Sequence, residues 1–184
     1  MARKENQRIA LTRRLLQEGL LRLLAHEKLE DISVTALCRE AGINRATFYN
    51  HYTSPAALLK EMELSLVSKL QEINSHAETL DDILNQTELS CIMLKENTEL
   101  FQTLVCYHAD RDIEQLVKDI AKHYKEHRLG ASHSVLDDDT AHLVSAYLYS
   151  GCYHLLREWL VHDIDKTPRE IAELLVSIVS KEYL

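Results

Sequence analysis

Residues 33–52 read SVTALCREAGINRATFYNHY, and this stretch decides the fold of the N-terminal part of the chain. Val34, Leu37 and Ala41 recur at the spacing of one helix face, which predicts a short helix with one buried side. Ser33 precedes the first apolar residue, where its hydroxyl can accept a hydrogen bond from a backbone N–H that the helix leaves unpaired. The stretch therefore opens with a capped helix.

A second short helix is predicted directly after the first. Gly42 stands where a tight turn between helices needs a positive φ, and Asn44 is placed to cap the next helix. Phe48 is the inward-facing residue of this second helix. Its outward-facing positions are polar or small: Arg45, Ala46, Thr47 and Asn50. Two short helices joined by a glycine turn, the second exposing polar side chains, indicate a DNA-binding helix-turn-helix.

Residues 8–60 resemble the N-terminal domain of the TetR/AcrR family of transcriptional regulators. The resemblance rests on the Ala41-Gly42 turn and on the Thr-Phe-Tyr-x-His-Tyr run of residues 47–52. It implies that Arg45 and Thr47 read base edges in the major groove, where arginine pairs with guanine and threonine contacts thymine. The full set of DNA-contacting residues implied in this way is Ser33, Thr35, Asn44, Arg45, Ala46, Thr47, Tyr49, Asn50, His51 and Ser54.

One position departs from the family pattern. Many members carry a lysine that contacts a DNA phosphate where this chain has Pro55, so a weaker sequence-independent affinity is expected. Ser54 and Pro55 instead predict the start of a further helix, with serine as its cap and proline at its first position. Packing against neighbouring helices remains an alternative to DNA contact for Tyr49, His51 and Tyr52.

Charge is distributed unevenly along the chain. The first 60 residues hold 10 Lys and Arg against 6 Asp and Glu, a net charge of +4. Residues 61–184 hold 11 against 23, a net charge of −12, and together the two parts give the formal net charge of −8. A basic N-terminal part on an acidic remainder suits a small domain that binds a polyanion. Ordinary variation of surface charge is the alternative.

The composition indicates an all-α fold, because only 4 Gly and 2 Pro interrupt the chain and apolar residues recur at helical spacing. We expect a three-helix helix-turn-helix domain over residues 1–53 and a larger helical domain over residues 54–184, with about nine helices in all. Asn97 is expected to cap one of the helices of the larger domain. The helices predicted after the helix-turn-helix lie near residues 54–70, 80–94, 98–105, 112–128, 139–162 and 168–179.

The last two predicted helices carry more apolar surface than a single chain is expected to cover. Residues 139–162 are apolar on more than one side, and Gly151, which costs about 1 kcal/mol in helix propensity, suits a close approach of another backbone. Residues 167–170, Thr-Pro-Arg-Glu, predict a capping box that opens the final helix. We expect a homodimer held by an intermolecular four-helix bundle, as the resemblance also implies. The predicted interface residues are Val144, Leu148, Gly151, Leu155, Trp159, Ile171, Leu174, Leu175 and Ile178.

The resemblance also implies a small-molecule effector, because family members commonly hold an inducer between their central helices. The candidate lining residues are Tyr107, His108, Tyr124, Tyr147 and His154, each of which also suits a packed or surface position. We expect no cofactor and no metal site. The four cysteines form no CxxC pair, and His123 with His127 lacks further ligands at a suitable spacing.

The sequence therefore predicts a sequence-specific regulator of transcription, most readily a repressor, whose partners are an operator duplex, a second copy and a small effector. No catalytic pattern is present, so an enzyme is not expected. The first residues lack the apolar segment of a signal peptide, and the longest uncharged stretch, residues 143–156, is too short and polar to cross a membrane. A cytoplasmic protein without a membrane partner is expected. The alternatives are a regulator-like protein that acts mainly through a protein partner and, least favoured, an all-helical enzyme.

Overall fold

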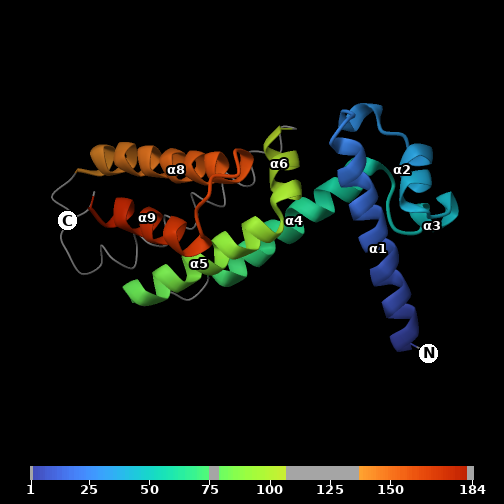
Figure 1. Cartoon of the computed structure of the whole chain (residues 1–184), viewed down its shortest axis with the longest axis horizontal. Helices are drawn as coiled ribbons and strands as arrows, with labels where there is room; N and C mark the ends of the chain where they lie inside the picture. The colour runs from blue at the N-terminus through green and yellow to red at the C-terminus, as the bar shows by residue number, and fades with distance from the viewer. Residues whose placement is uncertain (1, 75–78, 107–136, 182–184) are drawn as a thin grey trace. The chain divides into compact units, whose positions relative to one another are not determined.

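The structure, a computed structural model, describes residues 2–74, 79–106 and 137–181 (Figure 1). These residues form eight α-helices and one short 3-10 helix and contain no strand, which confirms the all-α prediction. The helix predicted over residues 112–128 lies outside the described residues. The elements are α1 (Ala2–Leu24), η1 (Leu29–Asp31), α2 (Val34–Ala41), α3 (Arg45–Tyr49), α4 (Pro55–Ile73), α5 (Leu80–Glu96), α6 (Thr98–Cys106), α8 (Asp138–Val161) and α9 (Pro168–Lys181).

The chain divides into two compact units, residues 1–66 and residues 67–184. The first unit holds α1, α2, α3 and most of α4, and α4 continues into the second unit as one helix. In the first unit α1 packs along α2, and α3 follows α2 (Figure 1). Its core consists of side chains with no exposed surface from all four helices: Leu16, Leu20, Leu37, Phe48 and Leu58.

Short polar side chains begin the helices of the first unit where the sequence predicted. Ser33 Oγ accepts a hydrogen bond from Ala36 N at 3.1 Å, and Asn44 Oδ1 accepts one from Ala46 N at 2.8 Å. Gly42 has a φ of 66° in the turn between α2 and α3, a conformation that glycine adopts without strain. Ser54 Oγ accepts from Ala57 N at 3.1 Å at the start of α4. The predicted caps and turn are confirmed.

In the second unit α5 lies alongside α9, and α6 packs against α8 (Figure 1). An ion pair joins α5 and α9, because Arg169 Nη1 lies 2.8 Å from Glu88 Oε2. Buried Asn74, just after α4, donates hydrogen bonds to Leu70 O and to Ser90 Oγ of α5, at 2.7 and 2.9 Å. Polar contacts as well as apolar packing therefore fix α5 against its neighbours.

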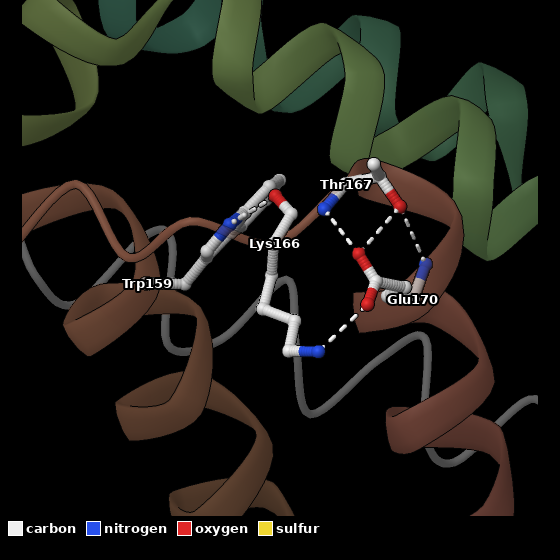
Figure 2. Close-up of polar contacts among 4 residues, drawn as sticks. All are labelled: Trp159, Lys166, Thr167 and Glu170. Atoms are coloured by element: carbon white, nitrogen blue, oxygen red, sulfur yellow. Dashed lines mark hydrogen bonds and ion pairs between the residues drawn. The ribbon is translucent and has the colours of Figure 1, made fainter.

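The connection between α8 and α9 is built around Trp159, whose side chain is 1% exposed. Its Nε1 donates to Lys166 O at 3.0 Å (Figure 2). Lys95 Nζ of α5 lies 5.2 Å from the centre of its ring. Thr167 and Glu170 then form the predicted capping box at the start of α9, with Thr167 N donating to Glu170 Oε2 at 2.9 Å and Glu170 N donating to Thr167 Oγ1 at 3.2 Å. The burial of Trp159 and the hydrogen bonds between side chains and backbone groups together stabilise the connection between α8 and α9.

Candidate nucleic-acid interface

Helix α3 is a short helix that is anchored on one side and open on the other. Phe48 is fully buried beneath it and contacts Tyr52, with ring centres 5.9 Å apart. Arg45, Ala46 and Asn50 are exposed, and Thr47 is half-buried. An anchored helix with a free polar face is the arrangement that a major groove accepts.

The aromatic residues at the end of α3 and just after it divide between packing and exposure. Tyr52 is buried, and its hydroxyl donates to Glu61 Oε1 at 2.9 Å. Burial and the neighbouring Glu61 carboxylate raise the pKa of Tyr52 to about 12, so its hydroxyl stays protonated. The packing interpretation is therefore confirmed for Tyr52. Tyr49 is different, because it rests edge-on against Phe48 and yet remains 52% exposed.

The remaining predicted contact residues surround α3. Thr35 is exposed in the first turn of α2, and His51 is half-buried after α3. Ser33, Asn44 and Ser54 use a side-chain oxygen as a helix cap, as described above, but the serine hydroxyls still have a hydrogen to donate. The predicted residues all lie in the first unit, around the turn and the ends of its short helices.

Arg45 differs from its neighbouring arginines in its charge partners. Arg14 and Arg22 form ion pairs with Glu18 and Glu40, at 2.8 and 2.6 Å, and Arg13 lies 3.7 Å from Glu61. No acidic side chain of the described residues pairs with Arg45. Burial raises the pKa of the Cys38 thiol, and the positive charge of Arg45 opposes that rise. The charge of Arg45 is thus available to a partner molecule, whereas the charges of Arg14 and Arg22 are paired within the chain.

The predicted dimer residues fall into three groups in the second unit. Leu148, Trp159, Ile171 and Leu175 are buried inside their own chain, so they stabilise the chain itself and are not available to a partner's surface. Val144, Leu155 and Ile178 are half-buried, and only Gly151 and Leu174 are exposed. The prediction included the inward face of α8 because periodicity alone does not tell which apolar face the chain covers.

The predicted effector residues require a correction. Tyr147 is 70% exposed, and His154 is also exposed, so neither lines the interior of the chain. Both lie on the outward face of α8 together with Leu143, which is 68% exposed. Tyr107, His108 and Tyr124 lie outside the described residues. No sequence pattern points to Gln86, whose Oε1 is buried without a hydrogen-bond partner among the described residues.

Three further features of the described residues concern metal binding, cysteine reactivity and membrane crossing. They contain no group of three or more His, Cys, Asp or Glu side chains that could hold a metal ion. Cys91 is buried, which raises the pKa of its thiol to about 12 and makes it a poor nucleophile. No helix within these residues combines the length and apolar character that crossing a membrane requires.

The first unit is therefore a helix-turn-helix domain of the class that binds DNA. Family profiles assign the class more narrowly. The profile described as "Bacterial regulatory proteins, tetR family" matches residues 16–62, and one described as "Transcriptional regulator C-terminal region" of the same family matches residues 81–181. The second profile alone spans more than half of the chain. The chain belongs to the TetR family of transcriptional regulators.

Individual proteins agree with this assignment. The HTH-type transcriptional regulator YdgC of Bacillus subtilis strain 168 is 26% identical over 162 residues, which cover 81% of this chain and 80% of YdgC. The dihydroxyacetone kinase operon activator DhaS has a similar structure, with a TM-score of 0.67 at 16% identity, and covers 94% of this chain and 96% of its own. A TetR-family regulator from Syntrophomonas wolfei gives a TM-score of 0.66 at 15% identity over 94% of both chains. These structures show a shared fold.

Proposed function

We propose that this protein is a homodimeric repressor that binds a specific operator duplex through α3 and is released by a small-molecule effector. The observation that carries the proposal is the open face of α3, where Arg45 is exposed and has no acidic partner in the described part of the chain, while Phe48 is buried on the opposite side. Residues 1–53 would supply the DNA contacts, and residues 54–184 would supply the dimer contacts and the effector site. Because α4 contains residues of both units, a movement of this helix caused by an effector in the second unit would be transmitted to the first unit through its backbone.

The experiment that tests DNA recognition is a selection from a pool of random duplexes with the full-length protein. The expected result is an enriched inverted repeat whose half-sites are one helical turn apart, about 34 Å, because a twofold dimer presents two recognition helices. A gel-shift titration then compares this repeat with a scrambled duplex of equal length. No enrichment, or equal affinity for both duplexes, would contradict sequence-specific binding.

The homodimer is supported by the outward face of α8. Leu143 and Tyr147 are two of the most exposed large apolar side chains of the described residues, and residues 143–156 contain no Asp, Glu, Lys or Arg. Two copies with a formal net charge of −8 each repel one another over most of their surface. An uncharged, apolar face is where such copies can meet, and a twofold interface requires a surface that complements itself. Light scattering of Tyr147→Glu against Glu173→Gln, an exposed change on α9, tests this assignment.

Repression is proposed because it requires only DNA binding, which the helix-turn-helix of the first unit supports. A dimer bound across a promoter blocks polymerase by occupying its site. A reporter gene behind the selected operator decides the sign of regulation. Lower transcription with the protein present is expected, and higher transcription would instead make the chain an activator, as the name of DhaS describes that neighbour.

Gln86 on α5 supports the effector part of the proposal. A buried acceptor without a donor costs about 1–3 kcal/mol, and such groups normally have a partner. A donor group on a bound molecule would satisfy Gln86 Oε1. The variant Gln86→Met keeps the length of the side chain and removes the acceptor. It should leave the free protein as stable as wild type or more so, while compounds that release wild type from the operator should act more weakly. Equal release of both proteins would contradict this role.

A further inference from the structure

Arg39 is a second arginine of the helix-turn-helix that has no acidic partner among the described residues. It lies in the last turn of α2, is exposed, and follows Thr35 by four residues, so the two share one face of the helix. The adjacent Glu40 does not neutralise it, because Glu40 Oε1 accepts from Arg22 Nε at 2.6 Å and Glu40 O accepts from Arg22 Nη2 at 3.3 Å. No acidic side chain of the described residues pairs with Arg39.

The backbone of Arg39 belongs to the turn that leads into α3. Its carbonyl oxygen accepts from Gly42 N at 3.3 Å, and the next carbonyl toward the N-terminus, that of Cys38, accepts from Ile43 N at 2.9 Å. The position of Arg39 relative to the recognition helix is therefore set by main-chain hydrogen bonds. Its side chain is exposed to solvent.

We propose that Arg39 binds a backbone phosphate of the operator, so that α2 adds a sequence-independent contact beside the bases read by α3. This inference rests on the proposed function. An arginine guanidinium binds a phosphate through two parallel hydrogen bonds, and such contacts fix the position of a protein on the duplex without reading its sequence. Thr35, one turn earlier on the same face, offers a hydroxyl to the same strand.

The start of α4 is a second reason to expect a phosphate contact from Arg39. Pro55 begins that helix and carries no charge, and Lys60, the next cation along α4, lies 3.0 Å from Glu63 Oε2. The exposed cations Arg8 and Lys28 lie on α1 and in the loop after it, away from the helix-turn-helix sequence. Arg39 and Arg45 are thus the two arginines that this motif itself presents without an acidic partner.

The test is the salt dependence of operator binding by Arg39→Gln in the full-length protein. Each lost phosphate contact lowers the slope of log affinity against log salt by about 0.9, so a dimer should lose about 2. Affinity for the operator and for a scrambled duplex should fall by the same factor, which leaves their ratio unchanged. Arg14→Gln is the matched control, because Arg14 is exposed but held by Glu18 at 2.8 Å, and its slope should equal that of wild type.

The outcomes separate this inference from the proposed function. Wild type that binds the operator, together with an Arg39→Gln slope equal to wild type, overturns the Arg39 contact alone. A loss of affinity for the operator without a loss of affinity for the scrambled duplex also overturns it, because that result means base recognition. Wild type that binds no duplex overturns both proposals. A reduced slope with an unchanged ratio, and no effect of Arg14→Gln, supports the phosphate contact.

Discussion

Gly19 of α1 faces Ala41 of α2 so closely that a side chain on residue 19 would crowd the backbone of α2. A Cβ on residue 19 would lie 3.1 Å from Ala41 Cβ and 3.2 Å from Ala41 N. The two helices therefore meet backbone against backbone, one residue before the Gly42 turn. Because α3 follows directly after that turn, the contact between Gly19 and Ala41 helps to set the position of the recognition helix relative to α1.

The first prediction is that Gly19→Ala destabilises the first unit and weakens DNA binding. Alanine gains about 1 kcal/mol in helix propensity, but its methyl group meets the backbone of Ala41, which has no rotamer to change. Overpacking of this kind costs about 1–3 kcal/mol. Chemical unfolding and operator binding measure the two effects. Asn85→Ala is the control, because it also raises helix propensity but does so at an exposed position of α5. A Gly19→Ala protein at least as stable as wild type would contradict the close packing.

The second prediction concerns Arg45. Arg45→Ala should leave the fold intact, because the side chain is exposed and unpaired, and should remove discrimination between the operator and a scrambled duplex. A bidentate contact with guanine accounts for about 1–3 kcal/mol per half-site. The measured quantity is the ratio of the two affinities, with circular dichroism as the check on folding. If that ratio stays at the wild-type value, Arg45 does not read bases. This response also differs from that of Arg39→Gln, which should keep the ratio.

The helix-turn-helix could be predicted from sequence because its signals are local. Ser33, Gly42 and Asn44 each act on backbone groups within three residues, so their types and positions suffice. Gly19 was not singled out, since its role depends on Ala41, which is 22 residues later in the chain. A glycine in a helix can mark a close contact, but the sequence does not name the partner.

The second unit was less predictable, because its details depend on tertiary packing. Trp159 and Tyr147 lie on the same apolar helix, yet Trp159 is buried and Tyr147 is exposed. Asn97 was expected to cap α6, and its side chain instead donates to Met93 O of α5 at 2.7 Å. Asn97 lies between the C-terminal end of α5 and the N-terminal end of α6. Both ends leave backbone groups without a partner in the helix, and a side-chain amide can hydrogen-bond to either.

Because Trp159 is buried within its chain, the third prediction is that Trp159→Ala destabilises the chain whatever the protein concentration. Removal of a buried aromatic side chain costs about 3–5 kcal/mol, and the variant also loses the hydrogen bond to Lys166 O. Trp159→Phe should be milder, since it retains most of the buried area. Denaturant unfolding at two protein concentrations measures both. A loss of stability that appears only in the dilute sample would instead assign Trp159 to the dimer interface.

The fourth prediction is a pH dependence at the start of α9. The Lys166 ammonium and the Thr167 N–H and hydroxyl bind the Glu170 carboxylate and lower its pKa from 4.5 to about 2 (Figure 2). A carboxyl group with a lowered folded pKa stabilises the fold above its unfolded pKa, and that contribution is lost as pH falls from about 4.5 to about 2. Wild type should therefore melt at a higher temperature than Glu170→Gln at pH 7, and the gap should close by pH 2. A gap of constant size would show that the charge of Glu170 is not responsible.

The last prediction uses Gly151 to test the proposed dimer. In an isolated chain Gly151→Ala should be neutral or stabilising, because alanine favours the helix by about 1 kcal/mol and its Cβ meets no atom of its own chain within 4 Å. If α8 crosses the partner's α8 at this glycine, the added methyl group holds the two helices apart. The dimer should then dissociate more readily while each chain remains at least as stable as before.

Analytical ultracentrifugation over a range of concentrations separates these opposite effects. We expect the dissociation constant of Gly151→Ala to rise by about tenfold or more, which corresponds to about 1.4 kcal/mol. Asn85→Ala is the control, because it improves helix propensity at an exposed position of α5 and should leave the dimer unchanged. An unaltered dissociation constant would place the crossing away from Gly151. A dimer that also survives Tyr147→Glu and Leu174→Lys would exclude the exposed faces of α8 and α9 as its interface.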